Sequence, residues 1–148
     1  MALKISWPGV LAVAVMYVVI SQLVFMLGAY ADMAYYMDPA YYSVWSKLMM
    51  PSAGPPPIEF TATSVAFGII SGLLFALVYS VVKGSVPGKE WGNKGLMYGF
   101  LVFLIAGIPS TLSLLLLINL PPGLVLSWML QGFVTYLLAG LVAAKLLK

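Results

Sequence analysis

Charged side chains are confined to short intervals of this chain, and long apolar tracts separate them. Three tracts carry no charged residue: Ile5 to Ala31, Phe60 to Val82 and Gly95 to Ala144. The last tract is long enough for two helices, and the helix-breaking run from Asn119 to Gly123 divides it. A helix rises about 1.5 Å per residue and the hydrocarbon core of a bilayer is about 30 Å thick, so each of the four pieces can cross once.

This pattern predicts an all-α polytopic membrane protein, in which residues 1–148 form a single four-transmembrane-helix bundle. The expected helices cover residues 5–31, 58–83, 92–118 and 123–147, and residues 32–57 form an external loop. Composition agrees, because only 7% of the residues are charged, against roughly 25% in soluble domains. The first apolar tract is far longer than the roughly 7–15 residues of a signal-peptide core, so we expect a permanent helix there.

The lysines predict the orientation of the bundle. All except Lys47 lie near the two ends of the chain or in the connection at residues 83–94. By the positive-inside rule, we expect both termini and this connection to be cytoplasmic, in a multi-pass protein of the cell membrane. The net charge of the chain is +3. The lysines lie at helix ends rather than along one helix face, and lysines at helix ends anchor helices in a bilayer. We therefore expect the lipid bilayer, and not nucleic acid, as the partner of these charges.

The external loop is long and rich in aromatic residues and methionine. Asp38 followed by Pro39 is typical of a helix start, so we expect a short interfacial helix from Pro39 to Met49, ended by Pro51. One interpretation makes this segment a lid or a surface that docks a partner. The other is simple anchoring of the loop at the membrane interface.

Two further patterns concern how the helices pack. The series that begins at Gly68 in the second helix resembles the series that begins at Gly132 in the fourth, which suggests a two-plus-two internal repeat of the kind found in transporters, unless Leu, Ala and Gly match by chance. Small residues let membrane helices approach closely, either within the bundle or in a homo-oligomer or a complex with another membrane protein. The residues that we expect in this role are Gly68, Gly72, Gly99, Gly132 and Gly140.

Each predicted helix also carries a polar side chain, or a residue that interrupts the helix hydrogen bonds, at a similar depth below the outer surface of the membrane. The candidate ligand-binding residues are Gln22, Ser64, Ser110, Thr111 and Gln131. Pro109 lacks an N–H group, so it frees the carbonyl of Ile105 for a hydrogen bond from another side chain. One hypothesis is a small uncharged pocket that opens outward. The alternative is a set of interhelical hydrogen bonds, worth about 0.6 kcal/mol each.

The residue types that carry most catalytic chemistry are missing from this sequence. It contains no Cys, no His and no Arg, which excludes thiolate chemistry, haem ligation by His and zinc sites with His. Asp32, Asp38 and Glu59 are external carboxylates without the fixed spacing of a metal site. We therefore expect no enzyme activity, no cofactor and no metal.

One resemblance bears on the architecture. The second half, from Gly95 to Lys148, combines Pro109, the Pro-Pro-Gly turn at 121–123 and the run Leu-Leu-Ala-Gly-Leu-Val at 137–142. It resembles small prokaryotic four-helix integral membrane proteins of unknown function, which implies a fold and no activity. Two classes of function follow from the residues themselves. One is a non-catalytic accessory, structural or partner-binding component, and the other is a small oligomeric transporter or channel with an outward-facing uncharged polar pocket.

Overall fold

The computed structural model describes residues 5–41 and 58–148, and this part of the chain is helical with no strand. Within these residues, four helices are long and apolar enough to cross a membrane, as predicted. They are α1 (Trp7–Ala31), α4 (Ile58–Val82), a third span built from α5 (Trp91–Val102), η2 (Phe103–Gly107) and α6 (Ile108–Leu117), and α7 (Pro122–Leu146). The predicted ranges agree with these ends to within two residues.

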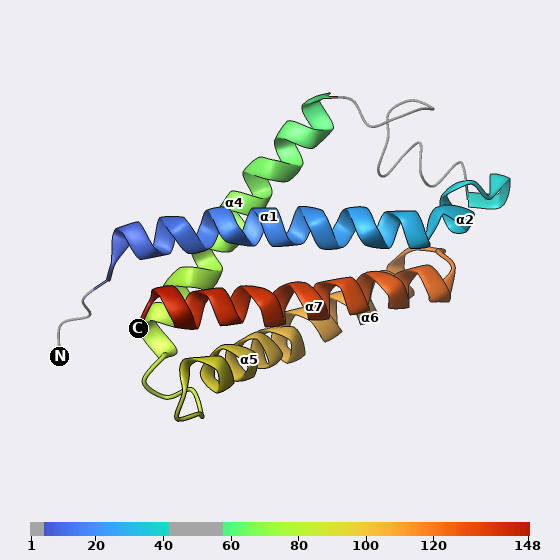
Figure 1. Cartoon of the computed structure of the whole chain (residues 1–148). Helices are drawn as coiled ribbons and strands as arrows, with labels where there is room; N and C mark the ends of the chain where they lie inside the picture. Colours follow the sequence, from blue (N-terminus) through green and yellow to red (C-terminus); the bar gives the residue numbers. More distant parts are fainter. Residues whose placement is uncertain (1–4, 42–57) are drawn as a thin grey trace.

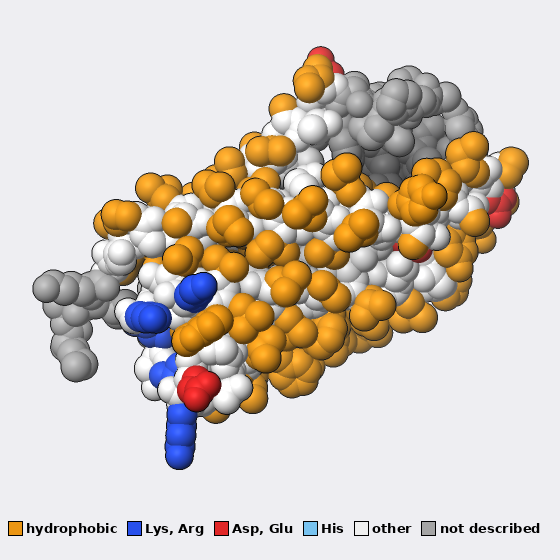
Figure 2. Space-filling view, in the orientation of Figure 1, with side chains coloured by type: hydrophobic (Ala, Val, Ile, Leu, Met, Phe, Trp, Pro, Cys, Tyr) orange, Lys and Arg blue, Asp and Glu red, His pale blue; other side chains and the backbone are white. Residues whose placement is uncertain are grey.

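Large apolar side chains cover the outside of the bundle. Leu116 is 84% exposed, Ile105 is 76% exposed and Phe67 is 65% exposed, and Figure 2 shows apolar side chains along the whole length of the visible face. A soluble monomer rarely exposes an apolar surface of this extent. Together with the four candidate spans, this apolar exterior indicates a multi-pass membrane protein.

The four spans are not equally packed against each other. Figure 1 shows α1 lying alongside α7, with the third span on the other side of α7. Helix α4 crosses α1 at a steep angle, so the first half of α4 projects away from α7. The start of α1 and the end of α7 lie at the same end of the bundle, which we call the lysine end. The opposite end, where α1 ends and α7 begins, is the loop end.

Glycines allow the closest helix contacts. A Cβ atom on Gly72 would lie 2.8 Å from the backbone of Ala14 in α1, and one on Gly68 would lie 3.1 Å from the side chain of Val18. Gly99 and Gly140 bring α5 and α7 together in the same way, since a Cβ on either would overlap the backbone of the other helix. Gly132 is different: a Cβ there would meet nothing within 4 Å. Gly132 therefore makes no close helix contact within the described chain, and a packing role for it in a homo-oligomer stays a prediction.

Pro109 changes the third span in an unexpected way. The segment just before it, η2, is a single π-helical turn, in which the N–H of Ile108 donates to the carbonyl of Phe103. Proline has no N–H to continue the α-helical ladder, and π-turns commonly accompany such interruptions. Gly107 leaves room for the Phe103 ring, because a Cβ there would lie 2.5 Å from that ring.

Only the beginning of the predicted interfacial helix falls within the described residues. A short helix, α2 (Met33–Tyr36), follows α1 directly, and η1 (Pro39–Tyr41) is a turn of 3-10 helix. The backbone N–H of Ala40 donates to the Asp38 side chain at 2.9 Å, so Asp38 does begin a helical turn. The rest of the range from Pro39 to Met49 lies outside the described residues.

Buried side chains form two separate clusters. The larger one fills the lysine end, between α1, the second half of α4, α5 and α7, and it comprises Val10, Val13, Phe75, Ala76, Tyr79, Val86, Tyr98, Ala139, Ala143, Ala144 and Leu147. The smaller one, at the loop end, is built on Leu120, Leu124 and Val125. Between them the divergence of α4 leaves a space that apolar packing does not fill.

Candidate functional site

A cleft of about 430 Å³ occupies the space between α1, α4 and α7. Its walls consist of Tyr17, Ser21, Gln22, Val24 and Phe25 from α1, Ser64 from α4, and Trp128, Gln131, Gly132, Thr135 and Tyr136 from α7. The spacing of three and four residues along α1 and α7 places each set on one helix face. Apolar and aromatic walls with a few polar groups are typical of ligand-binding clefts.

Gln22 links α1 to the diverging helix α4. Its side-chain Nε2 donates to the Ser64 hydroxyl at 3.0 Å. Because α4 leaves α7 at this level, the Gln22–Ser64 hydrogen bond spans one edge of the cleft. The sequence predicted that both residues lie in one polar layer, and in the structure they are in direct contact.

Gln131 belongs to a second polar group, at the loop end of the cleft. Its Nε2 donates to the Asp32 carboxylate at 3.0 Å, and the Ser127 hydroxyl donates to the same carboxylate oxygen at 2.8 Å. Asp32 is only 5% exposed, although the sequence suggested an external carboxylate. Gly28 makes room for this arrangement, since a Cβ there would overlap the Gln131 amide. The group ties the end of α1 to α7.

The two glutamines do not bond to each other, and both keep an unused acceptor. Each amide employs its NH₂ group in the bonds described above. The side-chain carbonyl oxygens of Gln22 and Gln131 accept no hydrogen bond within residues 5–41 and 58–148. The hydroxyls of Ser21 and Thr135 instead donate back to carbonyls of their own helices. Two of the residues that line the cleft therefore have an amide oxygen left to accept a hydrogen bond.

Tyr36 and Trp128 extend the polar group towards the loop. The indole N–H of Trp128 donates to the Tyr36 hydroxyl at 2.9 Å. Burial raises the pKa of the Tyr36 hydroxyl above its usual value near 10.0, and the charge of Asp32 acts in the same direction, against the opposing effect of the Trp128 hydrogen bond. Tyr36 is therefore neutral at physiological pH and adds no charge to this group.

Aromatic side chains close the cleft towards the lysine end. Tyr17 and Tyr136 line this end of the cleft. The centroid of the Phe75 ring lies 5.6 Å from that of Tyr17 and 6.2 Å from that of Tyr136. The Phe75 ring also contacts Tyr98, with 4.7 Å between the two centroids, and the Tyr98 centroid lies 5.0 Å from that of Tyr79. Tyr98 is fixed in place because its hydroxyl donates to the carbonyl of Phe75 at 2.7 Å. Together, these side chains close the cleft at its lysine end, and we call them the aromatic barrier: Tyr17, Phe75, Tyr79, Tyr98 and Tyr136.

The candidate residues of the third span lie elsewhere. Ser110 is exposed and donates to the carbonyl of Ala106, and Thr111 donates to that of Gly107, so both hydroxyls bond within their own span. Neither lines the cleft, because α1 and α4 lie on the other side of α7. Ser110 and Thr111 therefore do not share this cleft with Gln22, Ser64 and Gln131. Within the described residues, no cluster of three or more Asp, Glu, His or Cys side chains is placed to hold a metal.

Comparisons with protein-family models, with curated proteins and with solved structures find no match to this chain. The cleft must therefore be interpreted from its own geometry.

Several residues of the cleft, and of the polar group beside it, were absent from the sequence-based candidates. Tyr17 and Tyr136 resemble ordinary interior aromatics in a pattern, and Asp32 resembles a solvated charge at a helix end. One signal was available for Asp32: an acidic residue directly after an apolar helix can reach a polar stripe on a neighbouring helix. Ser127, Gln131 and Thr135 form such a stripe on α7 at spacings of four.

Proposed function

We propose that this protein is a non-catalytic membrane protein that binds a small, uncharged, amphipathic molecule in the cleft between α1, α4 and α7. The observation that carries the proposal is that Gln22 and Gln131, each with an unused amide acceptor, both line one aromatic-walled cleft of about 430 Å³. If polar residues served only to hold helices together, they would sit in a closed contact. Here they line an open space.

The chemistry of the walls suggests the ligand class. Amide oxygens accept hydrogen bonds, so a hydroxyl or amide N–H group on the ligand would bond to them. Tyr17, Phe25 and Tyr136 line the cleft and supply aromatic rings against which an apolar or aromatic body could pack. Asp32 does not line the cleft, and its bonded carboxylate oxygen already accepts two hydrogen bonds. A neutral ligand fits this arrangement better than a cation.

The proposal includes an orientation. Figure 2 shows Lys side chains gathered at the end where α5 begins and α7 ends. We place this lysine end in the cytoplasm of the cell and the loop end outside, according to the positive-inside rule. The cleft then opens outward and the aromatic barrier lies between it and the cytoplasmic face. In a transporter with two-plus-two repeats, this state would be the outward-facing one.

A second candidate function is that of an accessory subunit or a homo-oligomer. The observation that favours it is the divergence of α4, which leaves the first half of that helix without contact to α7 (Figure 1). A helix of a partner, or of a second copy, would then fill the cleft in place of a small ligand. Both candidates require the cleft, and they differ in its occupant.

Native mass spectrometry from mild detergent distinguishes the two candidates. We expect the wild-type protein to retain a small molecule of defined mass. Gly132→Phe should lose this mass while remaining folded, because the new ring enters the cleft at a position where a Cβ meets no atom within 4 Å. Retention of a second protein chain that Gly132→Phe displaces would favour the accessory role.

Leu130→Phe is the matched control for this experiment. Leu130 lies on the same helix and is 61% exposed on the lipid-facing surface, so the same ring added there leaves the cleft unchanged. The control should retain the small molecule at the wild-type level. Equal retention by wild type, Gly132→Phe and Leu130→Phe would contradict binding in the cleft.

A further inference from the structure

A second cavity, of about 630 Å³, lies at the lysine end, which we call the basal pocket. It is framed by the end of α4, the connection to α5, the first turn of α5 and the end of α7. Its walls are formed by Tyr79, Lys83, Gly84, Lys89, Glu90, Trp91, Lys94, Ala144, Leu147 and Lys148. The aromatic barrier separates it from the cleft, and Tyr79 is the side chain that the barrier and the basal pocket share.

The basal pocket is strongly basic. Its walls hold four lysines and one glutamate. The Lys83 ammonium donates to main-chain oxygens of Leu147 and Lys148, at 2.9 Å and 3.0 Å, and the Lys94 ammonium lies 3.4 Å from the carbonyl of Lys83. No Asp or Glu side chain forms an ion pair with these lysines in the part of the chain that the structure describes. The peptide carbonyls of Leu147 and Lys83 hold the ammonium groups in place but do not neutralise their charge.

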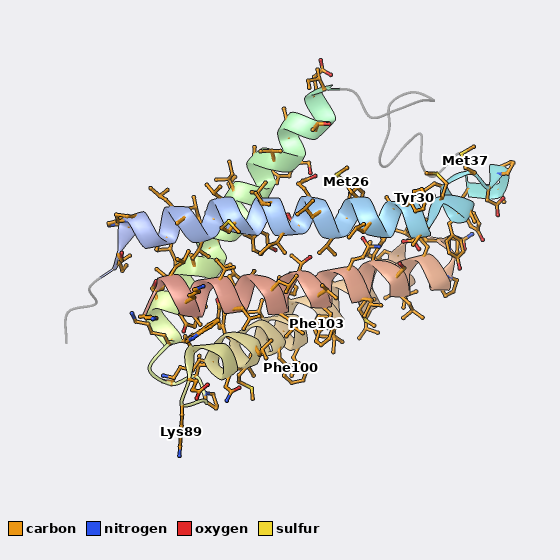
Figure 3. All side chains as sticks on the ribbon, in the orientation of Figure 1. Met26, Tyr30, Met37, Lys89, Phe100 and Phe103 are labelled. Atoms are coloured by element: carbon orange, nitrogen blue, oxygen red, sulfur yellow. The ribbon has the colours of Figure 1, made fainter. Side chains whose placement is uncertain are left out.

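The shape of the basal pocket is fixed by its turn. Gly88 has a φ of +135°, a conformation that side-chain-bearing residues rarely adopt, and a Cβ there would lie 2.9 Å from the backbone nitrogen of Lys94. The turn is therefore held against the start of α5. Lys89 follows it and extends from the rim away from the bundle (Figure 3). It adds positive charge to the entrance rather than to the interior.

Tyr79 supplies a second and independent indication of a ligand. Its side chain is 2% exposed and lines the basal pocket. Its hydroxyl has no hydrogen-bond partner within residues 5–41 and 58–148, whereas the hydroxyl of the neighbouring Tyr98 does have one. Buried hydroxyls are almost always hydrogen-bonded, so an unpartnered one at a cavity wall suggests an acceptor in the cavity.

From these observations, we propose that the basal pocket binds a phosphate group, with Lys94 and Lys83 providing charge and Tyr79 donating a hydrogen bond to a phosphate oxygen. The position fits the headgroup of an acidic phospholipid, because the basal pocket lies where the spans end. Trp91 lines the basal pocket, and the Lys145 ammonium lies 5.7 Å from the centre of the Trp91 ring. A tryptophan paired with a lysine is typical of the membrane interface. This site is independent of the proposed ligand in the cleft.

Thermal unfolding in detergent tests the site, because a ligand that binds only the folded protein raises the melting temperature. The probes are short-chain phosphatidylglycerol, short-chain phosphatidylcholine and inorganic phosphate. We expect stabilisation by phosphatidylglycerol that exceeds the effect of phosphatidylcholine. Lys94→Gln should weaken the apparent affinity about fivefold, a loss of about 1 kcal/mol, because it removes an ammonium group that lines the basal pocket. Tyr79→Phe should weaken it several-fold without lowering the melting temperature of the lipid-free protein.

Lys145→Gln is the matched control, because it removes the same charge at the same end from a residue that does not line the basal pocket. It should keep the wild-type response. If inorganic phosphate alone gives the Tyr79-dependent shift, the site binds free phosphate, and if only the lipid does, it binds a headgroup. Equal responses of wild type, Lys94→Gln and Tyr79→Phe to every probe would overturn the proposal, as would an absence of response in the wild type.

Discussion

Replacing Gly140 by alanine should lower the free energy of unfolding in detergent by about 2 kcal/mol, whereas the same change at Gly132 should not lower it. The two glycines lie on the same helix, α7. A Cβ on Gly140 would overlap the backbone of Gly95, which cannot move without shifting α5, and such overpacking costs about 1–3 kcal/mol. A Cβ on Gly132 meets no atom within 4 Å, and alanine improves helix stability by roughly 0.5–1 kcal/mol over glycine.

Chemical or thermal unfolding of both variants in the same detergent measures this difference. Because helix propensity changes equally at the two positions, the difference between the variants reports the α5–α7 contact alone. Equal stability of Gly140→Ala and Gly132→Ala would mean that these helices do not touch through Gly140 and Gly95.

Removing the Asp32 side chain should cost about 3 kcal/mol of stability. Asp32→Ala leaves the Gln131 amide and the Ser127 hydroxyl without their buried acceptor, and hydrogen bonds to a charged group contribute about 1.5–3 kcal/mol each. Asp38→Ala is the control, because Asp38 bonds only a local backbone N–H in the described structure and should cost less than about 1 kcal/mol.

A double-mutant cycle makes this prediction specific. Asp32→Ala and Gln131→Leu should be strongly non-additive, since either change alone breaks the same hydrogen bond. Gln22→Leu and Gln131→Leu should be additive within about 0.5 kcal/mol, because these glutamines bond to different partners. Coupling between the two glutamines, without coupling between Asp32 and Gln131, would contradict the observed hydrogen bonds.

The sequence predicted the spans because charge placement and length decide them almost alone. Bilayer thickness sets how many apolar residues each helix needs, and proline and glycine mark where a tract divides. Internal hydrogen bonding was harder to predict. The π-turn before Pro109 depends on how neighbouring turns adjust to a missing N–H, and the pattern of residues does not encode that choice.

The cleft was predictable only in part, because the sequence indicates depth in the membrane but not the neighbour of each helix. Gln22, Ser64 and Gln131 lie at a similar depth and do share a cleft. Ser110 and Thr111 lie at a comparable depth, but their helix packs on the far side of α7. Gly132 illustrates the same limit, since a small residue can line a cavity as readily as a helix contact. The internal repeat, the interfacial helix and the orientation stay predictions.

Cysteine accessibility at position 132 tests the central claim most directly, because the chain contains no native cysteine. We expect Gly132→Cys in intact cells to react with a membrane-impermeant thiol reagent added outside, since the cleft admits water to this position. Ser85→Cys, at the exposed turn after α4, should react only after permeabilisation, and Leu138→Cys, on the lipid-facing surface of α7, should stay largely unreacted. A Gly132→Cys variant that is folded but does not react from outside would contradict an outward-opening cleft.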